Sequence, residues 1–565
     1  MGKRGMKYGI QTILIILILV ILNAIAQRIN FFVDLTEEKR FTLTESTESL
    51  LKDVDDIVLI DILLEGELAS SFQRLKNRTE EIVKQFRSVN PLIEYKFTNP
   101  SQGSVEEINQ LRQQLSKDGI FPRNLLVTEG TQRVEKLIYP YAIIKYGERK
   151  IPVNLLEAIG RGGSEEEALN KSVKLLEFKL SSALNKLFLE EQPVILFTEG
   201  NGELREEQTA KLETDLGSTI ITGRINIDSI YQIDAEKVDI LIVAKPTRKL
   251  STRSKFIIDQ YIMSGGNVIW LIDQFHVNLD SINIKSPYVP RPIEHGLDDL
   301  FFKYGVRINK DLLLDLENSK IPQVIGMQGG QAQQQLFPWV YHPLLQGNPN
   351  STIVRNIDRV SSTFASSVTP LDNPLELSYT TLLTTSNYSR FQLYPMRLSF
   401  DILKLEQRPE AYNKKFLPVA IMVEGEFESL YKNRVTESMT QALNQINASF
   451  VEKSKKKSIQ VFAGDGDIIK NLFVKGRISP IGFNKWEGIT YSGNNEFIMN
   501  IIDYILDDYG LMEARTKNVK LRLLDQVKLQ EEGFKWQIIN LLGPIVFVLL
   551  FALIFSYIRK KRFGS

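Results

Sequence analysis

Residues 193–204, PVILFTEGNGEL, decide the fold because the pattern changes there from a β-strand to the start of a helix. Residues 194–197 form a short apolar run, which is typical of a buried strand. Gly200 and Gly202 then allow a tight turn before a polar segment. A strand, a glycine turn and a helix together form the unit with which many α/β folds present a nucleophile or bind a phosphate. The stretch therefore predicts an α/β module and makes its turn a candidate site.

The residues that follow repeat the same alternation of strand and helix. Residues 238–246, VDILIVAKP, and residues 267–273, NVIWLID, read as two further buried strands. Between them, residues 250–266 have a helical pattern that ends at a pair of glycines. Strands that alternate with helices predict a doubly wound, mainly parallel α/β sheet.

Polar residues follow each of these strands, at the edge where doubly wound sheets bind ligands. The predicted ligand-binding residues are Glu199, Asn201, Glu203, Lys245 and Asp273, with His276 close behind in the sequence. The turn itself carries Asn201 where an α/β hydrolase would have a serine and an amidotransferase a cysteine. Because an asparagine is a poor nucleophile, we predict no catalytic residue here and expect the protein not to be an enzyme.

Two pairs of carboxylates leave alternatives open. Glu199 and Glu203 have the residue type for an acid/base pair or a cation site, but also for solvating the turn and stabilising the helix N-terminus. Asp465 and Asp467, in GDGD, have the residue type for Mg²⁺, although the spacing falls short of an EF-hand loop. Asp467 also suits a helix cap. We predict neither a metal nor a cofactor.

The N-terminal part of the chain predicts a second α/β module. Thr44 is placed to cap a helix, residues 56–66 read as a buried strand, and residues 92–97 alternate as another strand. The helix expected between the two strands has its apolar side chains near helical spacing: Phe72, Leu75, Ile82, Val83 and Phe86. This β-α-β unit looks like a thioredoxin-like module. A long amphipathic helix over residues 165–188 follows a glycine turn that predicts a hinge or, alternatively, an anion site.

Composition excludes several classes of chemistry. The chain has no cysteine, which removes disulfides, thiolate catalysis and thioredoxin redox chemistry. It has three histidines without HExxH spacing, so a histidine-rich metal site is not expected. The formal net charge of +1, with no basic stripe, argues against a nucleic-acid partner.

Both ends of the chain carry membrane signals. Residues 10–27 are mostly apolar behind Lys3, Arg4 and Lys7, which fits either a membrane anchor or a cleaved signal peptide. Residues 534–558 predict a spanning helix, and the basic residues 559–562 that follow place the C-terminus in the cytoplasm. Two spans of common orientation predict that both termini are cytoplasmic and that the bulk lies in the periplasm of a bacterium.

The resulting domain organisation has eight parts. Between residues about 281 and 457 the pattern loosens, and the Gly/Gln-rich residues 326–339 are expected to form a mobile loop or a partner-binding surface. The predicted parts are a basic N-terminus (1–9), transmembrane helix 1 (10–27), a thioredoxin-like module (28–160), a linker helix (161–190), an amidotransferase-like module with the insertion (191–510), a charged connector (511–533), transmembrane helix 2 (534–558) and a basic tail (559–565).

The order of the motifs resembles the gliding-motility-associated GldG family of Bacteroidetes. The likeness rests on DLTEEKRFTLTESTESLL after the first span, TEGNGEL, the run from residue 238 to 273, AGDGD followed by GNNEFIMN, and WQIINLLGP entering the second span. Related proteins often carry GHGE where this chain has Asn201 in GNGE. The second module looks like the GIFT domain, an amidotransferase-like fold that also serves assembly in an intraflagellar transport subunit.

The resemblance implies a function that agrees with the residues. It implies a non-enzymatic, periplasm-facing auxiliary subunit of an ABC-type transporter in the inner membrane, required for gliding, with a separate permease and a separate cytoplasmic ATPase as partners. The absence of a Walker A sequence fits such a subunit. The alternative is a ligand-binding protein that captures a small molecule or glycan for the transporter. A cryptic metal-dependent hydrolase is a third hypothesis, and a homo-oligomer stays open.

Overall fold

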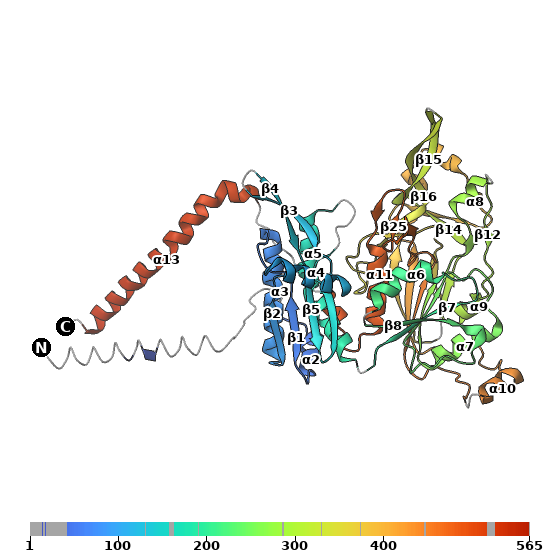
Figure 1. Ribbon diagram of the computed structural model, residues 1–565, viewed down its shortest axis with the longest axis horizontal. Coiled ribbons are helices and arrows are strands. Elements are labelled where there is room, and N and C mark those ends of the chain that lie inside the picture. Colours follow the sequence, from blue (N-terminus) through green and yellow to red (C-terminus); the bar gives the residue numbers. More distant parts are fainter. Residues whose placement is uncertain are drawn as a thin grey trace. The chain divides into compact units, whose positions relative to one another are not determined.

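The computed structural model has a mixed α/β architecture and divides into two compact units, Met1–Lys517 and Asn518–Ser565. Figure 1 shows the sheets and helices of the first unit and the long helix of the second. The described residues are Leu14, Leu17, Ile18, 42–129, 132–157, 163–189, 191–217, 219–284, 287–328, 330–372, 375–445, 448–516 and 526–563.

A four-stranded sheet forms the N-terminal part of the first unit. Its strand order is β2 (Ile93–Phe97), β1 (Val58–Ile62), β5 (Tyr141–Tyr146) and β6 (Arg149–Asn154). Strands β1 and β2 are parallel and are joined by α3 (Ser70–Val89), whereas β5 is antiparallel to both β1 and β6. The predicted β-α-β unit is therefore confirmed.

The helices around this sheet were predicted unequally well. Thr44 accepts a hydrogen bond from the backbone N–H of Thr47 and caps α2 (Glu45–Lys52), as expected. Helix α4 (Val105–Lys117) has a capping box between Ser104 and Glu107 but was not expected, because Leu115 is its one buried residue among those described. A two-stranded hairpin, β3 (Arg123–Glu129) and β4 (Gln132–Ile138), follows.

The long helix α5 has the predicted bounds, Glu165–Phe188, and begins at a capping box between Ser164 and Glu167. Helix α5 packs against α2, α3, β5, β6 and α12 (Met512–Thr516). One continuous hydrophobic core contains Ile60 of the small sheet, Leu180 of α5 and Ile242 of the large sheet. The predicted linker helix is therefore a buried core element. The predicted glycine hinge, residues 160–163, lies outside the described residues apart from Gly163.

A ten-stranded sheet dominates the rest of the first unit, and it is mixed. Its parallel half is, in order, β22 (Ser458–Ala463), β10 (Asn267–Leu271), β9 (Ile240–Ala244), β7 (Val194–Glu199) and β8 (Ile221–Asn226). Its antiparallel half continues from β22 through β21 (Pro418–Gly425), β19 (Ser378–Thr384), β16 (Gln331–Gly347) and β15 (Asn318–Gln328). The tenth strand, β17 (Val360–Ser361), lies off this path and is antiparallel to β16. The prediction of a mainly parallel sheet holds for the first half, while the predicted insertion supplies the antiparallel strands β21, β19, β17, β16 and β15.

Both faces of the parallel half are covered, as a doubly wound sheet requires. Strand β9 shows this directly, since Ile240 and Ile242 belong to one core cluster and Leu241 and Val243 to another. The first cluster also receives side chains of α5, α6 (Glu206–Leu216) and α11 (Gly493–Ile505). The second receives those of α7 (Thr252–Met263) and α9 (Asp298–Lys303).

The Gly/Gln-rich segment forms the paired strands β15 and β16, which project as a hairpin in Figure 1. Gln323 pairs with Gln335, for example, through the backbone. The expectation of a loop was wrong because backbone pairing does not require apolar side chains, and glutamine does not prevent it. Val324, Ile325 and Met327 are exposed on this hairpin.

The second unit contains α13 (Gln526–Phe563), which includes Pro544. Its stretch Phe534–Ile558 is long and apolar enough to cross a membrane. Residues 526–533, predicted to be part of the connector, belong to the same helix. The predicted first span, residues 10–27, lies outside the described residues apart from Leu14, Leu17 and Ile18.

Candidate functional site

The strand order places the expected ligand crevice between β7 and β9. Strand β7 leads to β8 on one side of it, and the chain then returns to form β9 on the other side. In doubly wound sheets, ligands bind where the strand order reverses in this way. Here the chain closes the crevice itself: Leu204 N–H donates to Ala244 O at 3.0 Å, and the N–H groups of Thr247 and Arg248 donate to Asn201 O at 3.0 and 2.9 Å.

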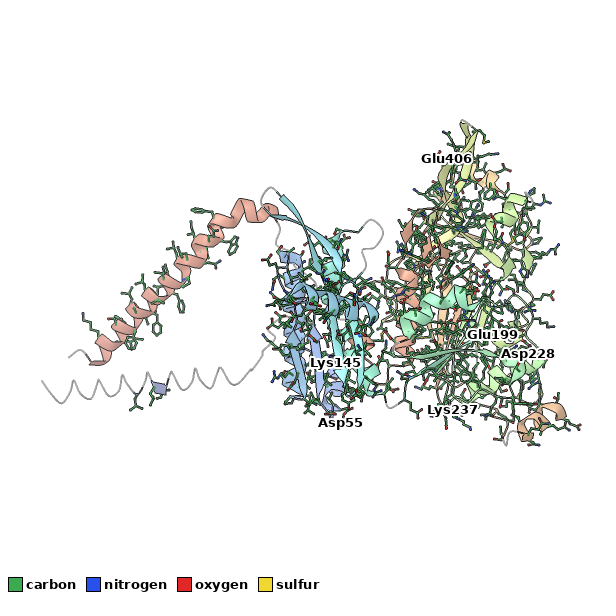
Figure 2. The ribbon with its side chains drawn as sticks, in the orientation of Figure 1. Asp55, Lys145, Glu199, Asp228, Lys237 and Glu406 are labelled. Carbon is green, nitrogen blue, oxygen red and sulfur yellow. The ribbon has the colours of Figure 1, made fainter. Side chains whose placement is uncertain are left out.

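The turn after β7 is built for packing. Asn201 and Glu203 are both buried, and Asn201 N–H donates to Glu203 Oε2 at 2.6 Å. Gly202 has φ 81°, and a Cβ there would lie 2.1 Å from Thr247 Oγ1, so a larger residue would displace the neighbouring loop. Glu199 is exposed at the end of β7 (Figure 2). Glu203 therefore stabilises the turn through this hydrogen bond, a role that differs from the predicted solvation of the turn and stabilisation of the helix N-terminus.

The other two predicted site residues meet in what we call the edge cluster: Lys245, Asp273, Asp465 and Asp467. Lys245 Nζ lies 2.8 Å from Asp273 Oδ2 and 2.5 Å from Asp467 Oδ2. Lys245 directly follows β9 with φ 57°, an uncommon conformation for a lysine. A Cβ on Gly466 would lie 2.6 Å from Lys245 Cβ, so glycine at 466 lets the two loops approach.

Hydrogen bonds complete the cluster. Gly466 N–H donates to Asp273 Oδ1 at 2.6 Å, and Asp467 N–H donates to Asp465 Oδ1 at 2.7 Å. Thr363 contributes twice, through its N–H to Asp465 Oδ2 at 2.7 Å and its hydroxyl to Asp467 Oδ2 at 3.2 Å. The edge cluster is therefore a hydrogen-bonded and ion-paired network that joins the ends of β9, β10 and β22.

Burial and charge set the protonation of these groups. Burial raises the pKa of Asp273, and it raises the pKa of Asp465 well above the ordinary value, where the two neighbouring carboxylates add to the effect. Burial also opposes the charge of Asp467, but Lys245 and Lys470 outweigh it and hold the pKa of Asp467 at about 2. Likewise, Asp273 and Asp467 raise the pKa of Lys245 against the effect of burial. Lys245 and Asp467 thus form the charged pair at the centre.

The edge cluster contains Asp465 and Asp467, for which the sequence left a Mg²⁺ site open. Within the described part of the chain, no three His, Asp or Glu side chains are grouped so that they could hold a metal ion. The ammonium group of Lys245 supplies the positive charge among the aspartates. Asp467 does not cap a helix as expected, because a turn follows it. It pairs with lysines instead.

The inserted region contributes residues that the sequence did not reveal. Thr363 lies 102 positions from Asp465. His342 is buried, and this burial lowers the pKa of its imidazole to about 3, so the ring is neutral. A cavity of about 330 Å³ lies beside these residues and is also lined by Asp465, Asp467 and Trp486. No local motif signals these residues, since they meet only through the mixed sheet.

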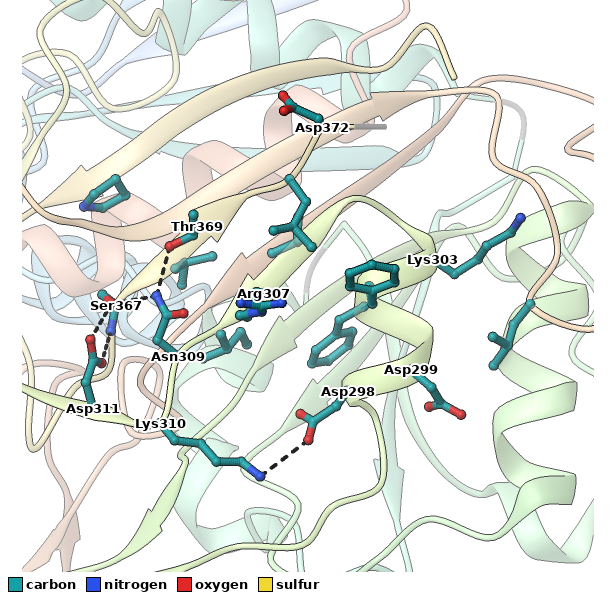
Figure 3. Close-up of a pocket in the computed structure, with 18 of the residues that line it drawn as sticks. Asp298, Asp299, Lys303, Arg307, Asn309, Lys310, Asp311, Ser367, Thr369 and Asp372 are labelled. Carbon is teal, nitrogen blue, oxygen red and sulfur yellow. Dashed lines mark hydrogen bonds and ion pairs between the residues drawn. The ribbon is translucent and has the colours of Figure 1, made fainter. Parts of the chain in front are cut away.

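A larger hollow of about 1380 Å³ is lined by α9, β13 (Val306–Ile308) and β18 (Val368–Pro370). Figure 3 shows that its polar side chains largely pair with one another. Lys310 Nζ lies 3.6 Å from Asp298, and Asp311 accepts from both the N–H and the hydroxyl of Ser367 at 2.8 and 2.6 Å. Acidic and basic residues alternate around this hollow, so its charge selects no class of ligand.

The family assignment follows from comparison with known proteins. A family model described as an ABC-type uncharacterized transport system matches residues 192–501, more than half of the chain. The chain belongs to this family. A second model, a domain of unknown function, matches residues 37–145, which contain the small sheet up to β5. The match to the ABC-type transport family covers the large sheet and the edge cluster.

Two individual proteins are similar to this member of the ABC-type transport family. An uncharacterized protein of Borreliella burgdorferi is 22% identical over 561 residues, covering 94% of each chain. The solved structure of the mmIFT52 N-terminal domain has 13% identity and a TM-score of 0.30, and it covers 55% of this chain and 96% of that one. A TM-score this low does not establish a shared fold.

Proposed function

We propose that this protein is a membrane-anchored, non-enzymatic subunit of an ABC-type transporter complex. The family assignment over residues 192–501 is the observation that carries the proposal. Its partners would be a polytopic permease and a cytoplasmic ATPase. The apolar stretch Phe534–Ile558 supplies an anchor of the right length.

The proposed placement has the first unit in the periplasm, both termini in the cytoplasm and two spans in the inner membrane. Four basic residues follow the apolar stretch of α13, and basic residues favour the cytoplasmic side. The small sheet, with order β2-β1-β5-β6 and α5 after β6, supports a thioredoxin-like module. The parallel half of the large sheet supports an amidotransferase-like (GIFT) module.

A non-enzymatic role is favoured by the state of the polar groups at the sheet edge. The turn after β7 has no nucleophile, and Asn201 and Glu203 bond to each other. Lys245 is held in ion pairs with Asp273 and Asp467. A general acid or base must be able to reach a substrate, whereas Glu203 is buried and Lys245 is occupied by its ion pairs.

The test is purification of the tagged, full-length protein from native membranes in mild detergent, followed by identification of the proteins that co-purify. We expect a polytopic permease and an ABC ATPase in fixed ratio. A matched preparation of a variant with Phe534–Ile558 replaced by an unrelated apolar helix separates anchoring from recognition. Recovery of the chain alone, under conditions that keep other transporters intact, would contradict the proposal.

A role in gliding motility is the narrower part of the proposal and rests on the resemblance in motif order. Deletion of the chromosomal gene should abolish spreading on agar in a gliding host, and the full-length protein should restore it. If a version of the protein that does not bind the permease also restored spreading, its role in motility would not depend on the transporter.

The second candidate function is capture of a small molecule or glycan for the transporter. The observation that favours it is the cavity beside the edge cluster, because the crevice between β7 and β9 is closed by the chain. A ligand would raise the melting temperature of the protein. Absence of any such shift across a panel of metabolites would count against this candidate.

A further inference from the structure

The cavity of about 330 Å³ lies past the C-terminal end of β22, and strands β10 and β9 separate β22 from the closed crevice. Its volume is at the lower end of the range typical of small-molecule sites. It is lined by the loop after β22, by β16, and by the hairpin of β25 (Phe483–Asn484) and β26 (Ile489–Thr490). The inserted region and the family's core sheet therefore build this site together.

Hydrogen-bond acceptors and donors lie along one side of the cavity. Asp467 contributes a carboxylate, Asp465 contributes a carboxyl group whose pKa is raised by burial, and Thr363 contributes a hydroxyl. These three side chains are held by one another, since Thr363 donates to both aspartates. Side chains fixed in this way meet a ligand without losing further conformational freedom.

His342 gives an independent sign that the site lacks a partner. This residue lines the cavity and is only 3% exposed, and its Nε2 atom has no hydrogen-bond partner among the described residues. Buried polar atoms are nearly always paired, because an unpaired one loses its hydration without compensation. An unpaired imidazole nitrogen at a polar cavity is expected where a ligand or its bound water completes the network.

An aromatic side chain also contributes to the lining. Trp486 lines the cavity with 36% of its surface exposed, and its backbone N–H donates to Asn484 Oδ1 at 2.9 Å. Its ring lies nearly parallel to that of His342, with an interplanar angle of 17° and centroids 6.5 Å apart. Lys485 Nζ lies 5.2 Å from the centroid of the Trp486 ring. An aromatic face and fixed polar groups thus line the same cavity.

The charges of the cavity nearly balance. Its ionisable lining residues are Asp280, Asp465, Asp467, Lys470 and Lys485. Lys470 Nζ lies 3.1 Å from Asp467 Oδ1, so this pair is already neutralised. A strongly anionic ligand would meet the aspartates and a strongly cationic one the lysines. The balance favours a neutral ligand.

From this geometry we propose that the cavity binds a neutral sugar, either a free monosaccharide or the end of a glycan. A sugar ring has hydroxyl groups that donate to carboxylates and a C–H face that packs on indole. Asp465, Asp467 and Thr363 would bind its hydroxyls, and Trp486 would cover its apolar face. The proposal deepens the second candidate function and does not depend on assembly with a permease.

The experiment titrates the full-length protein with glucose, galactose and N-acetylglucosamine in a detergent without a sugar headgroup, so that the detergent does not compete. Calorimetry and the melting temperature report binding, and sodium phosphate serves as an anionic probe. We expect saturable binding of at least one sugar and none of phosphate. Trp486→Ala should weaken that binding about tenfold, equivalent to about 1.4 kcal/mol.

Two further variants make the outcome decisive. Trp486→Phe keeps an aromatic wall and should bind more tightly than Trp486→Ala, while Phe302→Ala removes an exposed aromatic residue of the other hollow and should bind as the unchanged protein does. The proposal is overturned by the absence of saturable binding for all three sugars, by equal affinity of Trp486→Ala and unchanged protein, or by tighter binding of phosphate. If a permease still co-purifies in those cases, the proposal that the protein is a subunit of a transporter is unaffected.

Discussion

Two clusters of charged side chains in the first unit use the same residue types in opposite ways. The edge cluster places Asp273, Asp465 and Asp467 around Lys245. The second, which we call the helix cluster, consists of Glu157, Lys171, Lys179 and Glu496. In the edge cluster, burial raises the pKa of Asp273 and of Asp465. In the helix cluster, Lys179 and Lys171 outweigh burial and lower the pKa of Glu157 to about 2.

The two clusters differ in how many lysines neutralise their carboxylates. Glu157 has two lysines, and Lys171 bridges it at 3.6 Å to Glu496 of α11 at 2.7 Å. The aspartates at the sheet edge share the ammonium of Lys245, and Lys470 adds a second contact to Asp467. Loss of one charge should therefore cost more at the edge cluster than at the helix cluster.

The largest effect is expected for Lys245→Ala. This change leaves buried carboxylates without their central partner, and removing one member of a buried ion pair costs about 3–5 kcal/mol. Urea unfolding of the full-length protein in detergent measures the loss. Lys249→Ala, at an exposed position four residues later, is the matched control and should stay within about 0.5 kcal/mol. Similar stabilities for the two variants would show that the edge cluster does not hold the loops together.

A smaller effect is expected for Glu157→Gln. The folded-state pKa of Glu157, about 2 against an ordinary 4.5, corresponds to about 3 kcal/mol. Because the pKa is lowered on folding, this stabilisation is present above about pH 4.5 and disappears as the pH falls towards 2. Glu157→Gln should thus be less stable than the unchanged protein at pH 7 and should differ less from it at pH 3. Exposed Glu191→Gln should show no such convergence.

A third prediction concerns His342, which lies beside the edge cluster. It should make the stability of the protein depend on pH in a different range from that of Glu157. Its folded-state pKa of about 3 lies below the ordinary 6.5, so the unfolded chain takes up the proton first. Stability should fall by about 2 kcal/mol from this residue as the pH drops from 8 to 5. His342→Gln should reduce the dependence of stability on pH in this range. Part of that dependence should remain, because burial also lowers the pKa of His295.

Exposed His276→Gln is the control for that pH measurement and should keep the full slope. An unchanged slope in His342→Gln would mean that the imidazole is accessible to protons in the folded protein. Together with the Glu157 variant, this experiment separates the two clusters by pH window: about 3 to 6.5 beside the sheet edge and about 2 to 4.5 at α5.

The smallest effect is expected for Glu199→Ala. Glu199 is exposed at the end of β7, and surface substitutions of this kind usually change stability by less than about 0.5 kcal/mol. A loss comparable to that of Lys245→Ala would return the turn after β7 to the list of functional candidates. Co-purification of the permease with Glu199→Ala should equal that of the unchanged protein.

Local elements were predictable because their signals are local. Helix α5 has the bounds expected from its apolar stripe, and α7, β9 and β10 form where the sequence placed them. Helix α4 was missed, since its capping box precedes a segment with little buried surface. The projecting hairpin was missed because glutamine side chains do not mark strands, although the backbone of β15 and β16 pairs along most of their length.

The sequence by itself determined the α/β alternation, the apolar stretch of α13 and the lack of a nucleophile at Asn201. It also placed Lys245 and Asp273 at the same edge of the sheet, because the carboxyl ends of parallel strands meet there. Only the tertiary structure decided that this crevice is closed, that Asp467 pairs with Lys245, and that Thr363 and His342 join them. The ion pair between Lys245 and Asp467 joins residues 222 positions apart, and the hydrogen bond from Thr363 to Asp465 joins residues 102 positions apart. No local periodicity in the sequence marks such distant positions as partners.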